Sequence, residues 1–325
     1  MKLSTYEKAV IEFISQEIRT VLKKVDPHRV ESFEEIRLRA NKPLMASNYH
    51  GDWFIQCDGS LSKVIANSFY VKQEDIINTL ELMSQNSIYA YQDEIKNGFI
   101  TLKGGHRVGI TGRIVMENNK VKNIKDISGM NIRLAREVPG CSRMIFGYLK
   151  SGGTDVCNTM IISPPQCGKT TMLRDIARTL SDGWEDKGFK GMTVGIVDER
   201  SEIAACNKGV PQFNVGMRTD VLDGCPKNIG MTMMIRSMSP RVIITDEIGN
   251  QGDMEAVMSV LNAGVKIITS AHGYDITELR SRKEVISMID ARIFDRYVVL
   301  SGINGPGTVE EIVDGKNMEV IYRRG

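Results

Sequence analysis

The sequence lacks the features that would place the protein within a membrane, in a disulfide-stabilised class or on nucleic acid. No stretch of 18 uncharged apolar residues occurs among its 325 residues, so we expect no membrane-spanning helix. The six cysteines show no Cys-x-x-Cys spacing, which favours reduced thiols over a disulfide or metal framework. Aromatic residues make up only 6%, and the net charge of +2 comes from Lys and Arg spread along the chain, so we expect no nucleic-acid partner.

The N-terminal segment also lacks the continuous apolar run of a signal peptide. Apolar residues in 1–22 recur at helical spacing among charged ones, which predicts an amphipathic helix. We therefore expect a cytoplasmic protein that acts in the cytosol or peripherally at the cytosolic face of a membrane. The length favours two domains over one.

The pattern of expected elements changes at the Gly-rich segment 151–154. Before it, an α+β domain is expected over 1–150, with strands at 35–39 and 53–56, a helix at 75–84 and a β-hairpin across 98–110. After it, strands and helices alternate over 151–325, which predicts an α/β domain with a parallel sheet covered by helices on both faces. The expected strands here are 160–163, 192–198, 242–246 and 265–270, the expected helices are 169–180 and 254–263, and three further strands are expected at 297–300, 308–313 and 318–322.

The most informative motif is the segment 161–171, Ile-Ile-Ser-Pro-Pro-Gln-Cys-Gly-Lys-Thr-Thr. An apolar strand, a turn and a helix follow one another, and the turn carries the Gly-Lys-Thr half of a P-loop. Backbone amides of such a loop surround phosphates at the positive end of the helix, Lys reaches the β- and γ-phosphates, and the Thr hydroxyl binds Mg²⁺. We predict an ATP- and Mg²⁺-binding loop formed by Pro165, Gln166, Cys167, Gly168, Lys169, Thr170 and Thr171.

One position departs from the P-loop pattern, because Ser163 stands where the first glycine is usual. A chance match in a Gly/Pro-rich turn is the alternative interpretation. Two features favour the P-loop. Pro164 and Pro165 have no backbone N–H group, but they stand in the first half of the loop, where donors to phosphate are not needed. Gly168 is present where the backbone must approach phosphate closely.

A second acidic element follows the apolar run 242–245. Parallel strands present ligands at their carboxyl ends, so Asp246 would hold Mg²⁺ through water and Glu247 would orient or deprotonate the attacking water. The alternative is a pair of acids at a helix N-terminus.

Other polar residues are weaker candidates for the same site. Asp198 and Glu199 end another apolar strand. They are either a second carboxylate pair that faces the nucleotide or acids on the surface. In the first case, the catalytic base could be Glu199 instead of Glu247. His272 follows the next strand, where it would either sense the γ-phosphate or be structural. Arg218 and Arg236 could stabilise transition-state charge from a neighbouring subunit, or could form surface or intramolecular contacts.

These motifs closely resemble the family of stage III sporulation protein AA ATPases. The resemblance rests on the segments 164–178, 197–204, 218–226, 236–240 and 246–249 and on the N-terminal segments 34–39, 98–101 and 104–109. It spans about residues 30 to 315. The family is similar to the ATPases of type II and type IV secretion systems, which form hexameric rings and carry a smaller N-terminal domain.

The resemblance implies a RecA-like P-loop domain and specific roles for matching residues. Lys169 and Thr170 match the Walker A residues, and Asp246 and Glu247 the Walker B pair. Asp198 and Glu199 lie at the family's Asp box and His272 at its His box. By this resemblance, the protein would be a homo-oligomeric motor, a hexamer, working with membrane proteins of a secretion-like complex between mother cell and forespore.

Two other functions share the P-loop. A small-molecule kinase would be expected to carry an Arg-rich lid segment, which we do not find in the sequence. A nucleotide-binding scaffold with a degenerate loop would explain Ser163, but the retained Lys169, Thr170, Asp246 and Glu247 favour hydrolysis.

Overall fold

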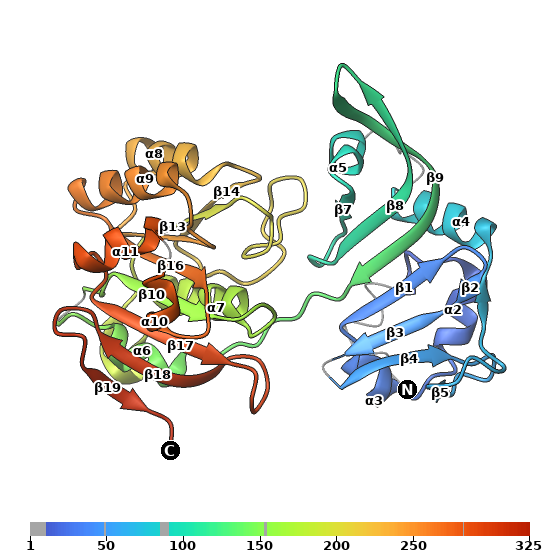
Figure 1. The fold of residues 1–325 in the computed structure, drawn as a ribbon, viewed down its shortest axis with the longest axis horizontal. Coiled ribbons are helices and arrows are strands. Elements are labelled where there is room, and N and C mark those ends of the chain that lie inside the picture. The colour runs from blue at the N-terminus through green and yellow to red at the C-terminus, as the bar shows by residue number, and fades with distance from the viewer. Residues whose placement is uncertain (1–10, 49, 85–90, 153–154, 282) are drawn as a thin grey trace. The chain divides into compact units, whose positions relative to one another are not determined.

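The computed structural model describes residues 11–48, 50–84, 91–152, 155–281 and 283–325 (Figure 1). The chain divides into two compact units, Met1–Arg136 and Glu137–Gly325. The division lies before the expected boundary at residue 150, because α6 (Arg143–Leu149) buries Ile145, Phe146 and Leu149 in the core of the C-terminal unit. Residues 153 and 154 of the expected Gly-rich boundary lie outside the described residues.

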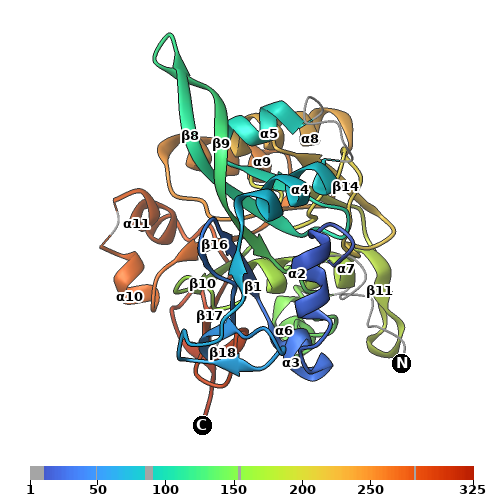
Figure 2. The ribbon, with the colours of Figure 1, turned by 90° about the vertical axis from the view of Figure 1, so that its right-hand side faces the viewer.

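The N-terminal unit is built on an antiparallel sheet of seven strands in the order β5-β4-β3-β1-β9-β8-β7. The expected hairpin is present between β7 and β8, and β8 continues into a long second hairpin with β9 (Figure 2). Asn118 and Asn119 form the turn of this second hairpin with positive φ angles of 49° and 60°. The strands are β1 (Glu35–Arg39), β3 (Met45–Asn48), β4 (Gly51–Ile55), β5 (Leu61–Ser62), β7 (Phe99–Thr101), β8 (Arg107–Glu117) and β9 (Lys120–Arg133), with β2 (Lys42–Pro43) and β6 (Tyr70–Val71) paired separately.

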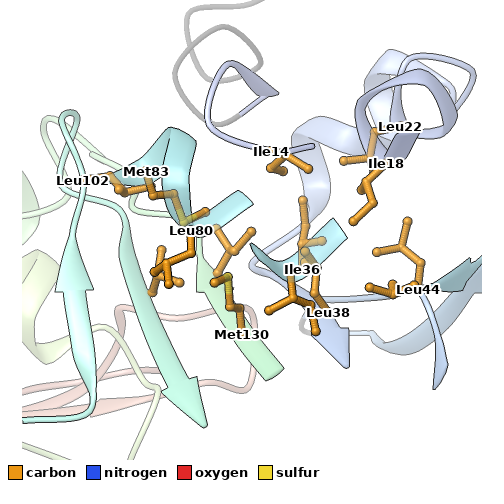
Figure 3. Close-up of a cluster of buried hydrophobic side chains, with 14 of the residues drawn as sticks. Ile14, Ile18, Leu22, Ile36, Leu38, Leu44, Leu80, Met83, Leu102 and Met130 are labelled. Carbon is orange, nitrogen blue, oxygen red and sulfur yellow. The ribbon is translucent and has the colours of Figure 1, made fainter. Parts of the chain in front are cut away.

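One face of this sheet is covered by helices that bury a single apolar core (Figure 3). Ile18 of α2 and Ile36 of β1 are buried there. Among the described residues, Ile11 is helical and α2 begins at Gln16, so the helix expected over 1–22 is interrupted before Gln16; residues 1–10 of that prediction lie outside the described residues. The reason is tertiary, because the Ser15 amide and hydroxyl bond to Thr79 and Asp75. The helices that the described residues of this unit form are α2 (Gln16–Leu22), α3 (Pro27–Ser32), α4 (Gln73–Met83) and α5 (Gln92–Lys96).

The C-terminal unit contains the predicted parallel sheet. Its eight strands have the order β14-β13-β15-β16-β10-β17-β18-β19. The strands from β14 to β17 pair in parallel, and β18 and β19 extend the sheet with antiparallel pairs. The strands are β10 (Thr159–Ser163), β13 (Val194–Asp198), β14 (Thr219–Asp223), β15 (Val242–Thr245), β16 (Lys266–His272), β17 (Arg296–Ser301), β18 (Thr308–Asp314) and β19 (Val320–Arg323), with a small separate pair of β11 (Gly183–Trp184) and β12 (Phe189–Lys190).

Helices cover both faces of this sheet, as the alternating pattern predicts. Ile161 of β10 packs in one core with α6 and α7 (Lys169–Asp182), and its neighbours Met160 and Ile162 pack in the other. The central strands are therefore apolar at successive positions. The second core includes residues of α8 (Lys227–Ser237), α9 (Gln251–Asn262), α10 (Ile276–Leu279) and α11 (Lys283–Asp290).

Strand β14 and helix α8 were not expected from the sequence. The helical signal of α8 is weakened by Gly230, which is buried against β13. A Cβ atom at this position would lie 2.4 Å from Val197 Cγ1, so only glycine permits this approach of helix to strand. No helix among the described residues is both long enough and apolar enough to cross a membrane.

Candidate functional site

The strand order brings the predicted polar residues to one edge of the C-terminal sheet. Strand β16 lies between β15 and β10, and β13 lies on the far side of β15. Because these strands are parallel, their carboxyl ends share one edge. Asp198, Asp246, His272 and the predicted phosphate loop, residues 165–171, therefore lie along the same edge.

The predicted phosphate loop has a backbone conformation suited to binding an anion. Gln166 and Gly168 have positive φ angles of 62° and 86°, and α7 begins at Lys169. Alternation of this kind turns backbone amides toward a common centre, and the first amides of a helix have no acceptor within the helix. Pro165 and Gln166 are exposed, and Cys167, Gly168, Thr170 and Thr171 are partly exposed, so a ligand can reach this loop.

Gly168 is required for a second reason. A Cβ atom at Gly168 would lie 2.8 Å from the amide nitrogen of Gly307, in the turn between β17 and β18. That amide donates a hydrogen bond of 2.9 Å to the Cys167 carbonyl. The turn between β17 and β18 thus fixes one carbonyl of the loop.

Lys169 is buried and folded back onto the loop. Its Nζ donates to the backbone oxygens of Ser163 and Pro164, both at 3.0 Å, and lies 3.0 Å from His272 Nδ1. Burial lowers the pKa of Lys169, and the nearby Glu247 carboxylate opposes this effect. Phosphate oxygens could replace the two backbone carbonyls as acceptors, since charged acceptors bind an ammonium more strongly than neutral ones.

Ser163 needs no glycine-like backbone. It ends β10 in register with His272, and its φ is not positive. Its hydroxyl donates to the Pro164 carbonyl at 2.8 Å and lies 3.3 Å from Lys169 Nζ. The serine therefore supports the position of Lys169 in this loop.

Asp246 has the environment of a metal-binding carboxylate. It is 3% exposed, and its Oδ1 atom has no hydrogen-bond partner. Burial raises its pKa to about 6, with further raising contributions from Asp198 and Glu247, while Lys227 opposes the shift. A buried carboxylate oxygen without a donor is a suitable partner for a hydrated Mg²⁺, and Thr170 lies at the start of α7 to supply a hydroxyl.

Glu247 lies between two polar side chains, His272 and Arg200, and contacts both. Its Oε1 is 2.7 Å from His272 Nε2, and its Oε2 is 3.2 Å from Arg200 Nη1. Its φ of 26° is unusual for a residue with a side chain, and its amide donates to Ser270 Oγ at 3.1 Å. The carboxylate is thus held at the edge of the sheet, one residue after Asp246.

Asp198 and Glu199 have separate partners. The buried Asp198 carboxylate accepts hydrogen bonds from the amides of residues 202, 203 and 204, at 2.9, 2.9 and 2.8 Å. Glu199 forms a 2.6 Å ion pair with the buried Lys227. Asp198 therefore shapes the loop after β13, and Glu199 neutralises a lysine.

Arg218 and Arg236 lie at the opposite edge of the sheet. Arg218 precedes β14, and its Nη1 donates to the carbonyl of Ser181 near the end of α7 at 2.7 Å. Arg236 is exposed in the last turn of α8, which leads to the amino end of β15. Within one chain, neither arginine is brought together with the phosphate loop.

Three residues of this edge were not identified from the sequence. Lys227 is 7% exposed beside the two acidic strand ends, Ser270 holds the Glu247 amide, and Arg200 pairs with the Glu247 carboxylate. Their partners are distant in sequence, so spacing gave no signal for Lys227 or Ser270. Arg200 directly follows the Asp198–Glu199 pair, and that proximity was the available clue.

Comparisons with known proteins agree with this architecture. The family model described as sporulation stage III, protein AA matches residues 5–320. Stage III sporulation protein AA of Bacillus subtilis (strain 168) is 41% identical over 314 residues, covering 97% of this chain and 97% of that protein.

Two solved structures share the fold at low sequence identity. The Legionella pneumophila ATPase DotB has a TM-score of 0.54 at 13% identity, covering 91% of this chain and 80% of its own. The pilus retraction motor PilT, solved with bound ADP, has a TM-score of 0.51 at 12% identity, covering 90% of this chain and 77% of its own. These similarities concern the fold.

Proposed function

The chain belongs to the stage III sporulation protein AA family, and from this premise we propose that it is a P-loop ATPase of the secretion-motor type. One observation carries the proposal. An exposed phosphate loop, a buried carboxylate with an unpartnered oxygen and a carboxylate held by a histidine and an arginine lie at one edge of a RecA-like parallel sheet. ATP hydrolysis needs these groups together.

Each group has a distinct role in this proposal. The amides of Gln166 to Thr171 and the Lys169 ammonium bind the phosphates. Thr170 and Asp246 would hold Mg²⁺, which would supply positive charge that neutralises the phosphates. Glu247 orients the attacking water and accepts its proton, and His272 holds Glu247 in place through the 2.7 Å contact.

Glu247 is a better candidate for the base than Glu199. Glu199 forms an ion pair of 2.6 Å with Lys227. It follows β13, which is farther from the phosphate-loop strand β10 in the sheet than β15, the strand that precedes Asp246. Glu247 shares His272 with Lys169, so its carboxylate lies beside the phosphate-binding cation.

Assembly is part of the proposal. Arg218 and Arg236 lie at the far edge of their own sheet, so either would reach a phosphate only in a neighbouring subunit. We place the protein in a homo-oligomer, a hexameric ring at the cytosolic face of a membrane in the mother cell. There it would drive membrane proteins of a secretion-like sporulation complex.

The test measures ATP hydrolysis against protein concentration, beside mass determination by size-exclusion chromatography. Specific activity should rise as the oligomer forms. Lys169→Ala should remain folded by circular dichroism and lose activity by at least about a hundredfold, because a phosphate-binding cation is removed.

The result also separates the other two functions. A monomer whose full specific activity does not depend on protein concentration would favour a kinase. An assay for phosphate transfer to small molecules would then detect the kinase activity. Nucleotide binding without hydrolysis would favour the scaffold. Unchanged hydrolysis by folded Lys169→Ala would discard the phosphate-loop assignment.

A further inference from the structure

Arg200 belongs to the loop after β13 and lies at the phosphate-binding edge of its own subunit. Its Nη1 is 3.2 Å from Glu247 Oε2, and its side chain remains 54% exposed. Unlike Arg218 and Arg236, it therefore reaches the proposed base without help from a second subunit.

The loop that carries Arg200 is firmly anchored. Asp198 accepts three backbone amides from the loop, and the buried Arg174 donates to the carbonyls of Glu202 and Ile203 at 2.7 and 2.6 Å. Ser201, next to Arg200, has a positive φ of 54°. The backbone around Arg200 is thus fixed, while the exposed guanidinium can exchange partners.

Arg200 is connected to the phosphate-binding lysine through two side chains. Lys169 contacts His272 Nδ1 at 3.0 Å, His272 Nε2 contacts Glu247 at 2.7 Å, and Glu247 contacts Arg200 at 3.2 Å. This series of contacts contains two cationic side chains, Lys169 and Arg200, and one carboxylate, Glu247. A further anion at this edge would therefore be attracted by both cations, and it would compete with Glu247 for Arg200.

We propose that Arg200 distinguishes ATP from ADP by exchanging its Glu247 contact for the γ-phosphate. This inference rests on the proposed function, which places the γ-phosphate between Lys169 and the water that Glu247 orients. A guanidinium matches phosphate oxygens with a fork of donors, and the phosphate carries more charge than one carboxylate. ADP has no γ-phosphate, so the contact with Glu247 persists.

The exchange would couple recognition to catalysis. When Arg200 leaves, Glu247 Oε2 is free to accept a hydrogen bond from water, and Oε1 stays with His272. With ADP bound, the same oxygen remains occupied by Arg200. The residue thus determines nucleotide specificity and positions the base in the same movement.

The test compares binding of two nucleotides, so it does not depend on turnover. Dissociation constants for ADP and for a non-hydrolysable ATP analogue, both with Mg²⁺, are measured by calorimetry on wild type, Arg200→Ala and Arg200→Lys. The matched control is Arg323→Ala, which removes another exposed arginine paired at 3.1 Å with a glutamate, Glu311, on the antiparallel extension of the sheet.

Arg200→Ala should weaken the analogue about tenfold and leave ADP within about twofold, since one charge-assisted hydrogen bond to phosphate is lost. Arg200→Lys should recover part of the preference, and Arg323→Ala should match wild type. Equal weakening of both nucleotides, or of neither, would overturn the role of Arg200 while leaving the ATPase proposal intact. Failure of wild type to bind either nucleotide would overturn both.

Discussion

Replacing Asp246 with asparagine is expected to stabilise the protein in the absence of nucleotide and Mg²⁺ and to abolish hydrolysis. The carboxylate is 3% exposed, Oδ1 has no partner, and burial raises its pKa from 3.8 to about 6. The folded chain therefore holds a charge that its surroundings disfavour. Asparagine has nearly the same shape and carries no charge.

The size and sign of the effect follow from the pKa shift. A raised pKa means that the folded state binds the proton more tightly than the unfolded state. The contribution of protonated Asp246 to the stability of the folded state is fully present below pH 3.8, and it is lost as the pH rises through about 6. A shift of about two pH units corresponds to roughly 3 kcal/mol. Asp246→Asn should therefore raise the free energy of unfolding by about 2–3 kcal/mol at pH 7.5 and by little at pH 4.

The assay is urea unfolding in EDTA, followed by the fluorescence of Trp184 in a Trp53→Phe background. Trp184 lies in the C-terminal unit, with its ring 5.4 Å from Phe146, so it reports unfolding of the unit that contains Asp246. Asp220→Asn is the control, because Asp220 is exposed on β14 and should change stability by less than about 0.5 kcal/mol.

Two outcomes would refute the reasoning. If Asp246→Asn were less stable than wild type at pH 7.5, the charge would be favourable in the empty site. If the gain persisted unchanged at pH 4, it would not arise from ionisation of Asp246.

Three further predictions concern the proposed chemistry and assembly. Glu247→Gln should bind ATP but hydrolyse it at least about a hundredfold more slowly, because the amide cannot accept the water's proton; single-turnover rates showing a larger loss in Glu199→Gln would move the base to β13. Ser163→Gly should change steady-state hydrolysis by less than about threefold, since the serine backbone is already extended and its hydroxyl is one of several Lys169 contacts; a many-fold gain would mean that the serine restrains the enzyme. Mixing Arg236→Ala with Lys169→Ala subunits should restore part of the activity that each lacks, and no recovery in mixtures of verified oligomers would exclude Arg236 as the residue acting across subunits.

Part of the proposed phosphate-binding edge could be predicted from local sequence. The strand, the turn with Gly168 and the helix starting at Lys169 are contiguous, so the motif carries its own geometry. The apolar runs that precede or end in Asp198, Asp246 and His272 likewise predicted parallel strands followed by polar residues, and the structure contains these strands as β13, β15 and β16. Continuous apolar runs give this information because both faces of each strand are buried.

Other features depended on which strands are neighbours. Placing β16 between β15 and β10 brings His272 into contact with both Lys169 and Glu247, and no local pattern encodes that order. The division after Arg136 was equally invisible, because it depends on α6 packing into the second core and not on a glycine-rich segment.

The sequence by itself determined which polar groups stand at the ends of strands: a Gly-Lys-Thr turn, carboxylates and a histidine. Tertiary structure decided how those groups are used. Asp198 became a support for a loop, Glu199 the partner of Lys227, and Glu247 the shared partner of His272 and Arg200. Short-range spacing fixes which residues a strand presents at its end, whereas contacts between side chains many residues apart depend on the packing of the whole sheet.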